Sequence, residues 1–406
     1  MKKIVILTIF IIAFVPLKKH HCNNYYNDNQ QNNKNSTIKP GIYNLIDSLN
    51  LLNGKKIGIV ANQTSIIDNV HLVDTLISLK QNVVKIFCPE HGFRGNADAG
   101  AKINNEIDEK TKLPLISIYG NNKKPSPEQL KNIDIMLFDL QDVGVRFYTY
   151  ISTLHYVMEA CAENKIPLIV LDRPNPNAAY VDGPVLDTSI CRSFIGMHPV
   201  PVVYGLTIGE YALMINGEKW LKNKIQCNIT IIPCKNYSHN KNYSLPIRPS
   251  PNLPNDRSIE LYPTLCLFEG TTFSVGRGTD KQFQIIGHPD LKNVNNVDYN
   301  FTPKPNFGDS KPVFNGVVCY GFDLSDSSFN SYIFNNQLNI GFIKYVYEIF
   351  PDKTKFFKST NSFDLLAGNK ILKQQIIKEI SEEDIRKSWE NDLKNFKIIR
   401  KKYLIY

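Results

Sequence analysis

Five short apolar segments recur along the first half of the chain, each rich in isoleucine and valine and each ending at a polar or glycine-rich stop. They span residues 56–60, 83–87, 114–118, 133–140 and 167–171. Several of the intervening segments repeat apolar residues at intervals of three or four, which is the period of an amphipathic helix. Continuous apolar strands that alternate with helices are typical of a parallel sheet covered on both faces. The sequence therefore predicts an α/β fold.

Polar side chains follow these predicted strands at the points where the strands end. Because the carboxyl ends of parallel strands lie along one edge of a sheet, where ligands bind, we expect these side chains to converge on one cleft. They are Glu90, His91 and Arg94 after the second strand, Asp142 and Arg146 after the fourth, and Asp172, Arg173 and Asn175 after the fifth.

The segment CPEHGFRG, which begins at Cys88, is the strongest candidate for an active-site loop. It places a carboxylate, an imidazole and a guanidinium within five residues, next to glycines that let the backbone approach a ligand closely. Glu90 is enclosed by Pro89 and Phe93 and is the best candidate for proton transfer. His91 would orient Glu90 or a sugar hydroxyl. A solvated surface turn is the alternative interpretation of the segment.

Asp142 and Glu269 are candidates for a second catalytic carboxylate. Two facing carboxylates are what glycoside hydrolysis usually needs, and glycines flank the segment FEGTTFSVGRGT that contains Glu269. Each residue has a structural alternative. Asp142 would then be a cap or turn ligand, and Glu269 would be the ion-pair partner of Arg277.

Arginines exceed the number that local structure needs. A guanidinium binds a carboxylate or phosphate through two parallel hydrogen bonds, so these arginines predict an anionic substrate. They are Arg94, Arg146, Arg173 and Arg277. Tyr148, together with Tyr119 and Tyr150, offers a flat amphipathic surface for a sugar ring. Asn252 belongs to a second polar cluster, over residues 249–254, that we expect to bind substrate.

Motifs for metals and nucleic acids are absent from the sequence, which contains neither HExxH nor a DxDxDG loop. We expect no metal and no cofactor. Aspartates near the predicted strand ends nevertheless leave a hard-cation site as an alternative: Asp98, Asp139, Asp142 and Asp172.

Eight cysteines are scattered singly, and we expect most to be buried as small apolar residues. The net charge is +9, but aromatic and basic residues do not alternate in the way that would point to nucleic-acid binding.

The N-terminus predicts an export signal over residues 1–21. Lys2 and Lys3 precede an apolar segment, residues 4–17, that is too short to span a bilayer comfortably. Cys22 lies where a bacterial lipoprotein carries its lipid, although His20 and His21 are larger than the residues that normally precede such a cysteine. Uncleaved anchoring and ordinary cleavage stay open. We expect an exported protein, either periplasmic or anchored as a lipoprotein in a bacterial envelope.

Longer motifs resemble one family of bacterial proteins along most of the chain, from about residue 41 to residue 406. The strings are CPEHGFRG followed by DAG, FDLQDVGVRFYTY, VLDRPNP, SPNLP, FEGTTFSVGRGT and the terminal KKYLIY. They resemble the proteins once called DUF1343 and now described as exo-β-N-acetylmuramidases of the NamZ type. The resemblance implies a Rossmann-like parallel-sheet domain, a second, smaller α/β auxiliary domain, and an active site in the cleft between them.

The resemblance also implies an activity, namely release of terminal N-acetylmuramic acid from the non-reducing ends of peptidoglycan fragments. Glu90 occupies the position of the family's proposed catalytic glutamate, and the lactyl carboxylate of the substrate would account for the surplus arginines. We expect the signal at 1–21, a polar linker at 22–37, the catalytic domain at 38–240 and the auxiliary domain at 241–406. A muropeptide-binding protein without turnover and a metal-dependent hydrolase are the alternatives.

Overall fold

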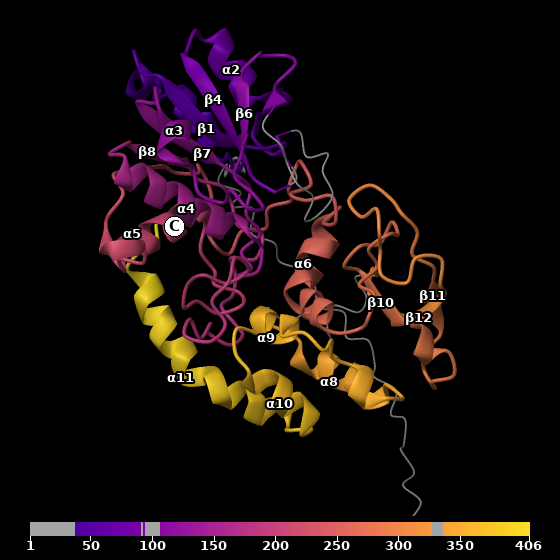
Figure 1. Cartoon of the computed structure of the whole chain (residues 1–406). Helices are drawn as coiled ribbons and strands as arrows, with labels where there is room; N and C mark the ends of the chain where they lie inside the picture. Colours follow the sequence, from indigo (N-terminus) through magenta and orange to yellow (C-terminus); the bar gives the residue numbers. More distant parts are fainter. Residues whose placement is uncertain (1–36, 91, 94–105, 327–335) are drawn as a thin grey trace, which may run out of the picture. The chain divides into compact units, whose positions relative to one another are not determined.

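A mostly parallel sheet of seven strands organises the part of the chain that the structure describes (Figure 1). The computed structural model describes residues 37–90, 92–93, 106–326 and 336–406. In spatial order the strands are β5 (Glu106–Ile107), β6 (Pro114–Ser117), β4 (Val83–Cys88), β1 (Ile57–Ala61), β7 (Ile135–Asp139), β8 (Leu168–Leu171) and β9 (Ile229–Ile232). Only the pairing of β5 with β6 is antiparallel among these described strands. Each of the five predicted segments contributes a strand, so the predicted α/β class is confirmed.

Helices cover both faces of the sheet, as predicted. Side chains alternate along a strand, and those of the central strands enter two separate apolar clusters. Ile57, Ile59 and Leu137 pack with one cluster, which includes residues of α1 (Gly41–Ile46) and α2 (Leu72–Ser78). Val60 and Phe138 pack with the other, which includes residues of α4 (Tyr150–Glu163) and α5 (Ile208–Gly217).

Local side-chain contacts set the ends of several helices. A capping box starts α5: Thr207 Oγ1 accepts from the Glu210 N–H at 3.2 Å, and Glu210 accepts from the Thr207 N–H at 2.9 Å. Helix α2 begins at Leu72, because the His71 ring accepts from the Val73 N–H at 3.2 Å and so caps the helix there.

A smaller unit of α and β structure follows. Its sheet has the order β10 (Ile285–His288), β12 (Cys319–Asp323), β11 (Tyr299–Phe301) and is antiparallel. Its helices are α6 (Asp256–Leu265), α8 (Ile340–Ile349), α9 (Ser362–Ala367), α10 (Ile371–Ile377) and α11 (Glu382–Lys401). One apolar cluster contains residues from both predicted domains, and the boundary near residue 240 stays a prediction.

Short elements complete the described part of the chain: α3 (Pro127–Leu130), β2 (Ile66–Ile67), β3 (Val70–His71), and 3-10 turns at Leu49–Leu52, Lys222–Lys224, Cys266–Gly270, Pro289–Leu291 and Lys353–Lys355.

The last helix, α11, runs from α10 back toward α5 (Figure 1). Ser381 caps its start, where Ser381 Oγ accepts from the Asp384 N–H at 3.1 Å, and the apolar face of the helix is buried. Beyond the helix, Tyr403 donates to Glu218 at 2.7 Å. None of the helices in the described residues combines the length and apolar character needed to cross a bilayer.

Candidate active site

A pocket of about 190 Å³ lies where the ends of β4 and β6 approach the segments around α6. Such a volume is below the ~300–1,000 Å³ typical of sites for drug-sized ligands and suits a single small ring. Five of the predicted site residues line it: Glu90, Tyr148, Asn252, Glu269 and Arg277. The other lining residues are Tyr119, Phe147, Thr149, Tyr150, Phe194, Ile195, Ser250, Leu253, Tyr262 and Phe283.

Glu90 accepts hydrogen bonds on both carboxylate oxygens. Tyr119 donates its hydroxyl to Oε1 at 2.8 Å, and Thr149 donates its hydroxyl to Oε2 at 3.1 Å. The strands explain the first contact, because β4 and β6 are parallel neighbours with Cys88 beside Ser117, so both chains leave the sheet at the same edge. Burial and the nearby charge of Glu90 raise the pKa of the Tyr119 phenol, which therefore stays a donor.

Glu269 pairs with Arg277 in the same pocket. Arg277 Nε donates to Glu269 Oε1 at 2.7 Å, and both side chains are partly exposed. Burial lowers the pKa of the Arg277 guanidinium, but the charge of Glu269 and its hydrogen bond raise it, and the net shift is upward. Gly276 and Gly278 on either side of Arg277 both have φ of +78°, a conformation that glycine adopts without strain. The pair therefore exists, as the structural alternative predicted, and it lies in the pocket.

Aromatic rings form a rigid part of the pocket lining. Tyr148 and Tyr150 meet edge to face with ring centroids 4.9 Å apart, and Tyr262 meets Phe283 in the same way at 4.9 Å. The hydroxyl of Tyr148 donates to the Pro249 carbonyl at 2.8 Å. Such pairs fix ring orientation, so these buried rings form a rigid wall of the pocket.

Asn252 brings an unpaired acceptor to the pocket. The residue is 2% exposed, and its Nδ2 donates to the Gly308 carbonyl at 2.9 Å. Its Oδ1 is buried and accepts no hydrogen bond from the described residues. A buried acceptor without a donor costs about 1–3 kcal/mol, which a hydroxyl or amide of a ligand would offset.

Asp142 is not among the residues that line the pocket, which corrects its prediction as a second catalytic carboxylate. It is buried and accepts from the Tyr204 hydroxyl and from the Gly144 N–H, the latter at 2.7 Å. Burial raises the pKa of Asp142 to about 7. Its side chain holds the turn after β7, where Gly144 has φ of +76°, and this is the turn-ligand alternative stated above.

Two of the predicted substrate-binding arginines serve the fold instead. Arg146 is fully buried and donates to the carbonyls of Pro184, Val200 and Leu366, each at 2.8 Å. Arg173 donates twice to Asp139, at 2.6 and 2.9 Å, in a buried pair. The structure brings neither guanidinium to the pocket: buried carbonyls bind the two Nη groups of Arg146, and the Asp139 carboxylate binds Arg173.

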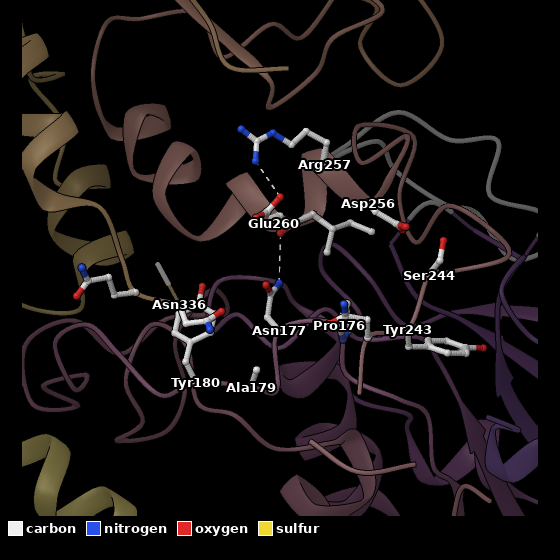
Figure 2. Close-up of a pocket in the computed structure, with 13 residues that line it drawn as sticks. Pro176, Asn177, Ala179, Tyr180, Tyr243, Ser244, Asp256, Arg257, Glu260 and Asn336 are labelled. Atoms are coloured by element: carbon white, nitrogen blue, oxygen red, sulfur yellow. Dashed lines mark hydrogen bonds and ion pairs between the residues drawn. The ribbon is translucent and has the colours of Figure 1, made fainter. Parts of the chain in front are cut away.

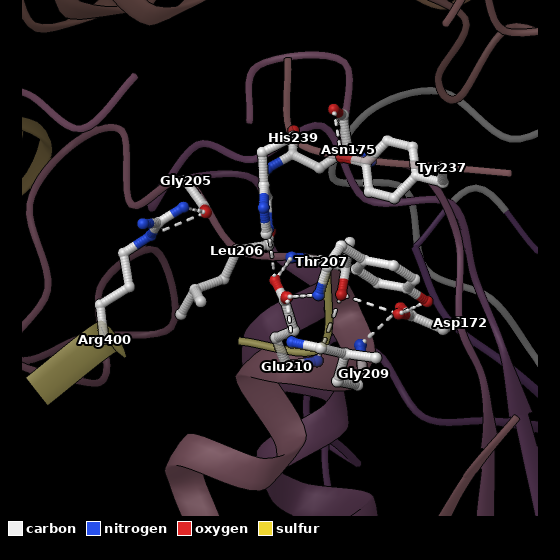
Figure 3. A network of polar contacts seen from close by, with 12 residues as sticks. Asp172, Asn175, Gly205, Leu206, Thr207, Gly209, Glu210, Tyr237, His239 and Arg400 are labelled. Carbon is white, nitrogen blue, oxygen red and sulfur yellow. Dashed lines mark hydrogen bonds and ion pairs between the residues drawn. The ribbon is translucent and has the colours of Figure 1, made fainter. Parts of the chain in front are cut away.

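Asp172 and Asn175 belong to a separate polar network around the start of α5 (Figure 3). Asp172 accepts from the Gly209 N–H at 2.7 Å and from the Tyr406 hydroxyl at 2.7 Å, and burial raises its pKa to about 6. Asn175 donates to the Leu206 carbonyl at 2.8 Å. These two residues therefore tie the end of β8, α5 and the C-terminus together, outside the pocket.

His91 and Arg94 lie outside the described residues, so their predicted roles stay predictions. So does any contribution from Asp98 to a cation site. Asp139, Asp142 and Asp172 are each engaged in the contacts given above. Within the ranges that the structure describes, no three His, Cys, Asp or Glu side chains gather as a metal site. All seven described cysteines are buried and free, as expected.

Three lining residues have roles in the pocket that the sequence does not predict. Tyr119 is predicted to offer a ring surface, but its hydrogen bond to Glu90 depends on the pairing of β4 with β6, which the chain order does not reveal. Thr149 was not predicted, although its position just before α4 was a signal that it would lie near the strand ends. Tyr262 lies on α6, outside any motif that suggests chemistry.

A larger cavity, of about 610 Å³, lies on another side of α6 (Figure 2). Its lining includes Asn177, Tyr180, Asp256, Arg257 and Glu260 and none of the predicted site residues. Arg257 is already paired with Glu260 at 2.9 Å. The smaller pocket is the better candidate for chemistry, because five of the predicted site residues line it and none lines the larger cavity.

Known proteins match this chain along most of its length. The family models for the N-terminal and C-terminal domains of exo-β-N-acetylmuramidase NamZ match residues 57–257 and 260–406. The chain is 39% identical to the peptidoglycan β-N-acetylmuramidase NamZ of Bacillus subtilis (strain 168), over 92% of this chain and 94% of that protein. Crystal structures of two DUF1343 family proteins from Bacteroides fragilis NCTC 9343 are also similar. One has a TM-score of 0.82 at 42% identity, the other 0.77 at 30%, and each comparison covers 91% of this chain and 99% of the other. The chain therefore belongs to the exo-β-N-acetylmuramidase NamZ family.

Proposed function

We propose that this protein is an exo-acting glycoside hydrolase that releases terminal N-acetylmuramic acid from peptidoglycan-derived saccharides during cell-wall turnover or recycling. One observation carries the proposal beyond family membership. Glu90 and Glu269 line the same small pocket, and Arg277 pairs with Glu269 there. Two carboxylates that face one site are the arrangement used by most glycoside hydrolases.

The hydrogen bonds suggest how the two roles are divided. Arg277 Nε donates to Glu269 Oε1 at 2.7 Å, so Glu269 is held beside a fixed positive charge. Tyr119 and Thr149 donate to the two carboxylate oxygens of Glu90 and so fix the orientation of this side chain, which lines the pocket. We assign proton transfer to Glu90 and stabilisation of the reacting sugar, or of the attacking group, to Glu269.

The pocket also suits a terminal anionic sugar. Its volume of about 190 Å³ leaves room for one ring, as an exo-acting enzyme requires. Arg277 uses Nε for Glu269, and its two Nη groups donate no hydrogen bond within the described residues. We assign these groups to the lactyl carboxylate of the substrate, since guanidinium–carboxylate pairing is strong and directional.

A substitution of Glu90 tests the proposal. The variant Glu90→Gln should keep the melting temperature of the unmutated protein and lose at least about 100-fold in release of a chromogenic N-acetylmuraminide, in line with general acid catalysis. The matched control is Glu128→Gln, whose side chain is 74% exposed on α3 and should leave turnover unchanged. Full activity of Glu90→Gln would remove Glu90 from the mechanism. Binding of the sugar without turnover by the unmutated protein would favour the binding-protein alternative.

We further propose that the protein is exported and held at the envelope through its N-terminus. The basic start, the apolar segment and the position of Cys22 support this. If Cys22 carries a lipid, Cys22→Ala should move the protein from the membrane fraction to the soluble envelope fraction. An unchanged distribution, together with an unmodified Cys22 by mass spectrometry, would exclude lipid anchoring.

A further inference from the structure

Phe307 is an exposed aromatic residue held next to the pocket. Its side chain is 51% exposed. Single exposed apolar residues are common on protein surfaces and need no explanation by themselves. Phe307 differs because the turn that carries it is fastened to two segments that line the pocket.

The first attachment joins the turn to Asn252. The Gly308 carbonyl, one residue after Phe307, accepts from Asn252 Nδ2 at 2.9 Å. Gly308 has φ of +99°, and a Cβ added there would lie 2.5 Å from Pro251 Cβ. Only glycine allows the turn to lie this close to residues 251–252.

The second attachment joins the turn to the segment that carries Arg277. Asn306, one residue before Phe307, donates its Nδ2 to the Thr279 carbonyl at 2.9 Å. The Lys304 N–H donates to the Gly278 carbonyl at 2.8 Å. Asn306 and Asp309 close the turn through reciprocal backbone hydrogen bonds of 3.1 and 3.3 Å. Phe307 is thus positioned by contacts on both sides rather than by a free loop.

Arg248 contacts the ring of Phe307. Its guanidinium carbon lies 5.6 Å from the Phe307 ring centroid, within the range of a cation–π contact. Within the described residues, the Arg248 side chain forms no ion pair and no hydrogen bond. Its backbone leads directly into the pocket, because the Pro249 carbonyl accepts from the Tyr148 hydroxyl and Ser250 is a lining residue.

From these contacts we propose that Phe307 and Arg248 form a second saccharide subsite, which binds the sugar ring on the leaving-group side of the scissile bond. The inference rests on the proposed function. A pocket with room for one ring leaves the next ring of the substrate outside it. Phe307 offers an exposed aromatic ring on the turn that is held by Asn252 and by the segment after Arg277.

The chemistry of the pair suits a neutral, N-acetylated sugar. A pyranose has an apolar face of ring C–H groups that packs on an aromatic ring, and its hydroxyl and acetamido oxygens accept hydrogen bonds. Arg248 supplies unpaired donors beside that ring, and a guanidinium offers five N–H groups in one plane. Asn252 lines the pocket and binds the Gly308 carbonyl next to Phe307, and its unpaired Oδ1 is an acceptor that a substrate donor would satisfy.

Two substrates of the same reaction test the subsite. One is a disaccharide of N-acetylmuramic acid β-linked to N-acetylglucosamine, and the other is N-acetylmuraminyl fluoride, which has no ring on the leaving-group side. Phe307→Ala should raise the KM for the disaccharide about tenfold, the scale of one aromatic contact, and change that for the fluoride less than about twofold. Phe307→Tyr should restore the disaccharide KM.

The matched control is Ile398→Ala, which removes an exposed apolar side chain (67% exposed) from α11 and should affect neither substrate. Equal effects of Phe307→Ala on both substrates, or no effect on either, would overturn the subsite and leave the proposed function standing. If the unmutated protein cleaves neither substrate, the proposed function and the subsite fail together.

Discussion

The Tyr119 hydroxyl donates to Glu90 Oε1 at 2.8 Å, across the ends of two neighbouring parallel strands. The contact joins residues that are 29 positions apart in the chain. It makes Tyr119 a positioning residue for the carboxylate to which we assign proton transfer. The consequence can be measured separately from substrate binding.

Tyr119→Phe should lower kcat for the chromogenic muraminide about tenfold with a much smaller change in KM. A hydrogen bond to a charged group contributes about 1.5–3 kcal/mol, and loss of orientation acts on the chemical step. Tyr43→Phe is the control, since it removes a tyrosine–carboxylate hydrogen bond to Asp68 outside the pocket. A rise in KM with unchanged kcat would show that Tyr119 only contacts substrate.

Arg277 should decide whether the enzyme recognises the lactyl carboxylate. We expect the unmutated protein to prefer an N-acetylmuraminide over its lactyl methyl ester by about tenfold or more in kcat/KM, because the ester cannot form a guanidinium–carboxylate pair. Arg277→Lys should lose most of this preference, since an ammonium cannot donate to Glu269 and the substrate with the same geometry. Equal preference in the variant and the unmutated protein would assign the carboxylate to another residue.

Arg146 should affect stability rather than catalysis. Arg146→Met leaves the carbonyls of Pro184, Val200 and Leu366 without their donors. The free energy of unfolding should fall by about 3 kcal/mol or more, since buried unpaired acceptors cost about 1–3 kcal/mol each. Urea unfolding measures this loss, and KM at low temperature should be unchanged. A raised KM without loss of stability would return Arg146 to the binding site.

Asp142 should make the stability of the protein depend on pH. Burial raises its pKa from 3.8 to about 7, so between these values the folded state binds a proton that the unfolded state has released. Stability therefore falls as pH rises through this window. Asp142→Asn should remove up to roughly 4 kcal/mol of this dependence, since one pKa unit corresponds to about 1.4 kcal/mol. Urea unfolding at pH 5 and pH 8 measures the difference, and identical pH dependence in both proteins would contradict it.

The sequence was most informative about the parallel sheet and about the kinds of residue that follow its strands. The segments at 57–61 and 135–139 are buried along their whole length, and their continuous apolar character identifies them as strands of a parallel sheet. Strand β9 was missed because it is at the sheet edge and only Ile232 within it is buried. Its short half-exposed pattern does not stand out from a loop.

Tertiary structure alone decided which polar residues reach the pocket. Glu90, Glu269 and Arg277 do, whereas Arg146 and Asp172 have the same types of side chain at the same edge and are buried in the fold. The reason is that strand ends and helix starts leave backbone groups that must find partners when they are buried. A charged residue near a strand end can either line the pocket or bind buried backbone groups, and the neighbouring elements determine which of the two it does. The chain order of the strands does not specify those neighbours, since β1 pairs with β4 on one side and with β7 on the other, and β6 lies beyond β4.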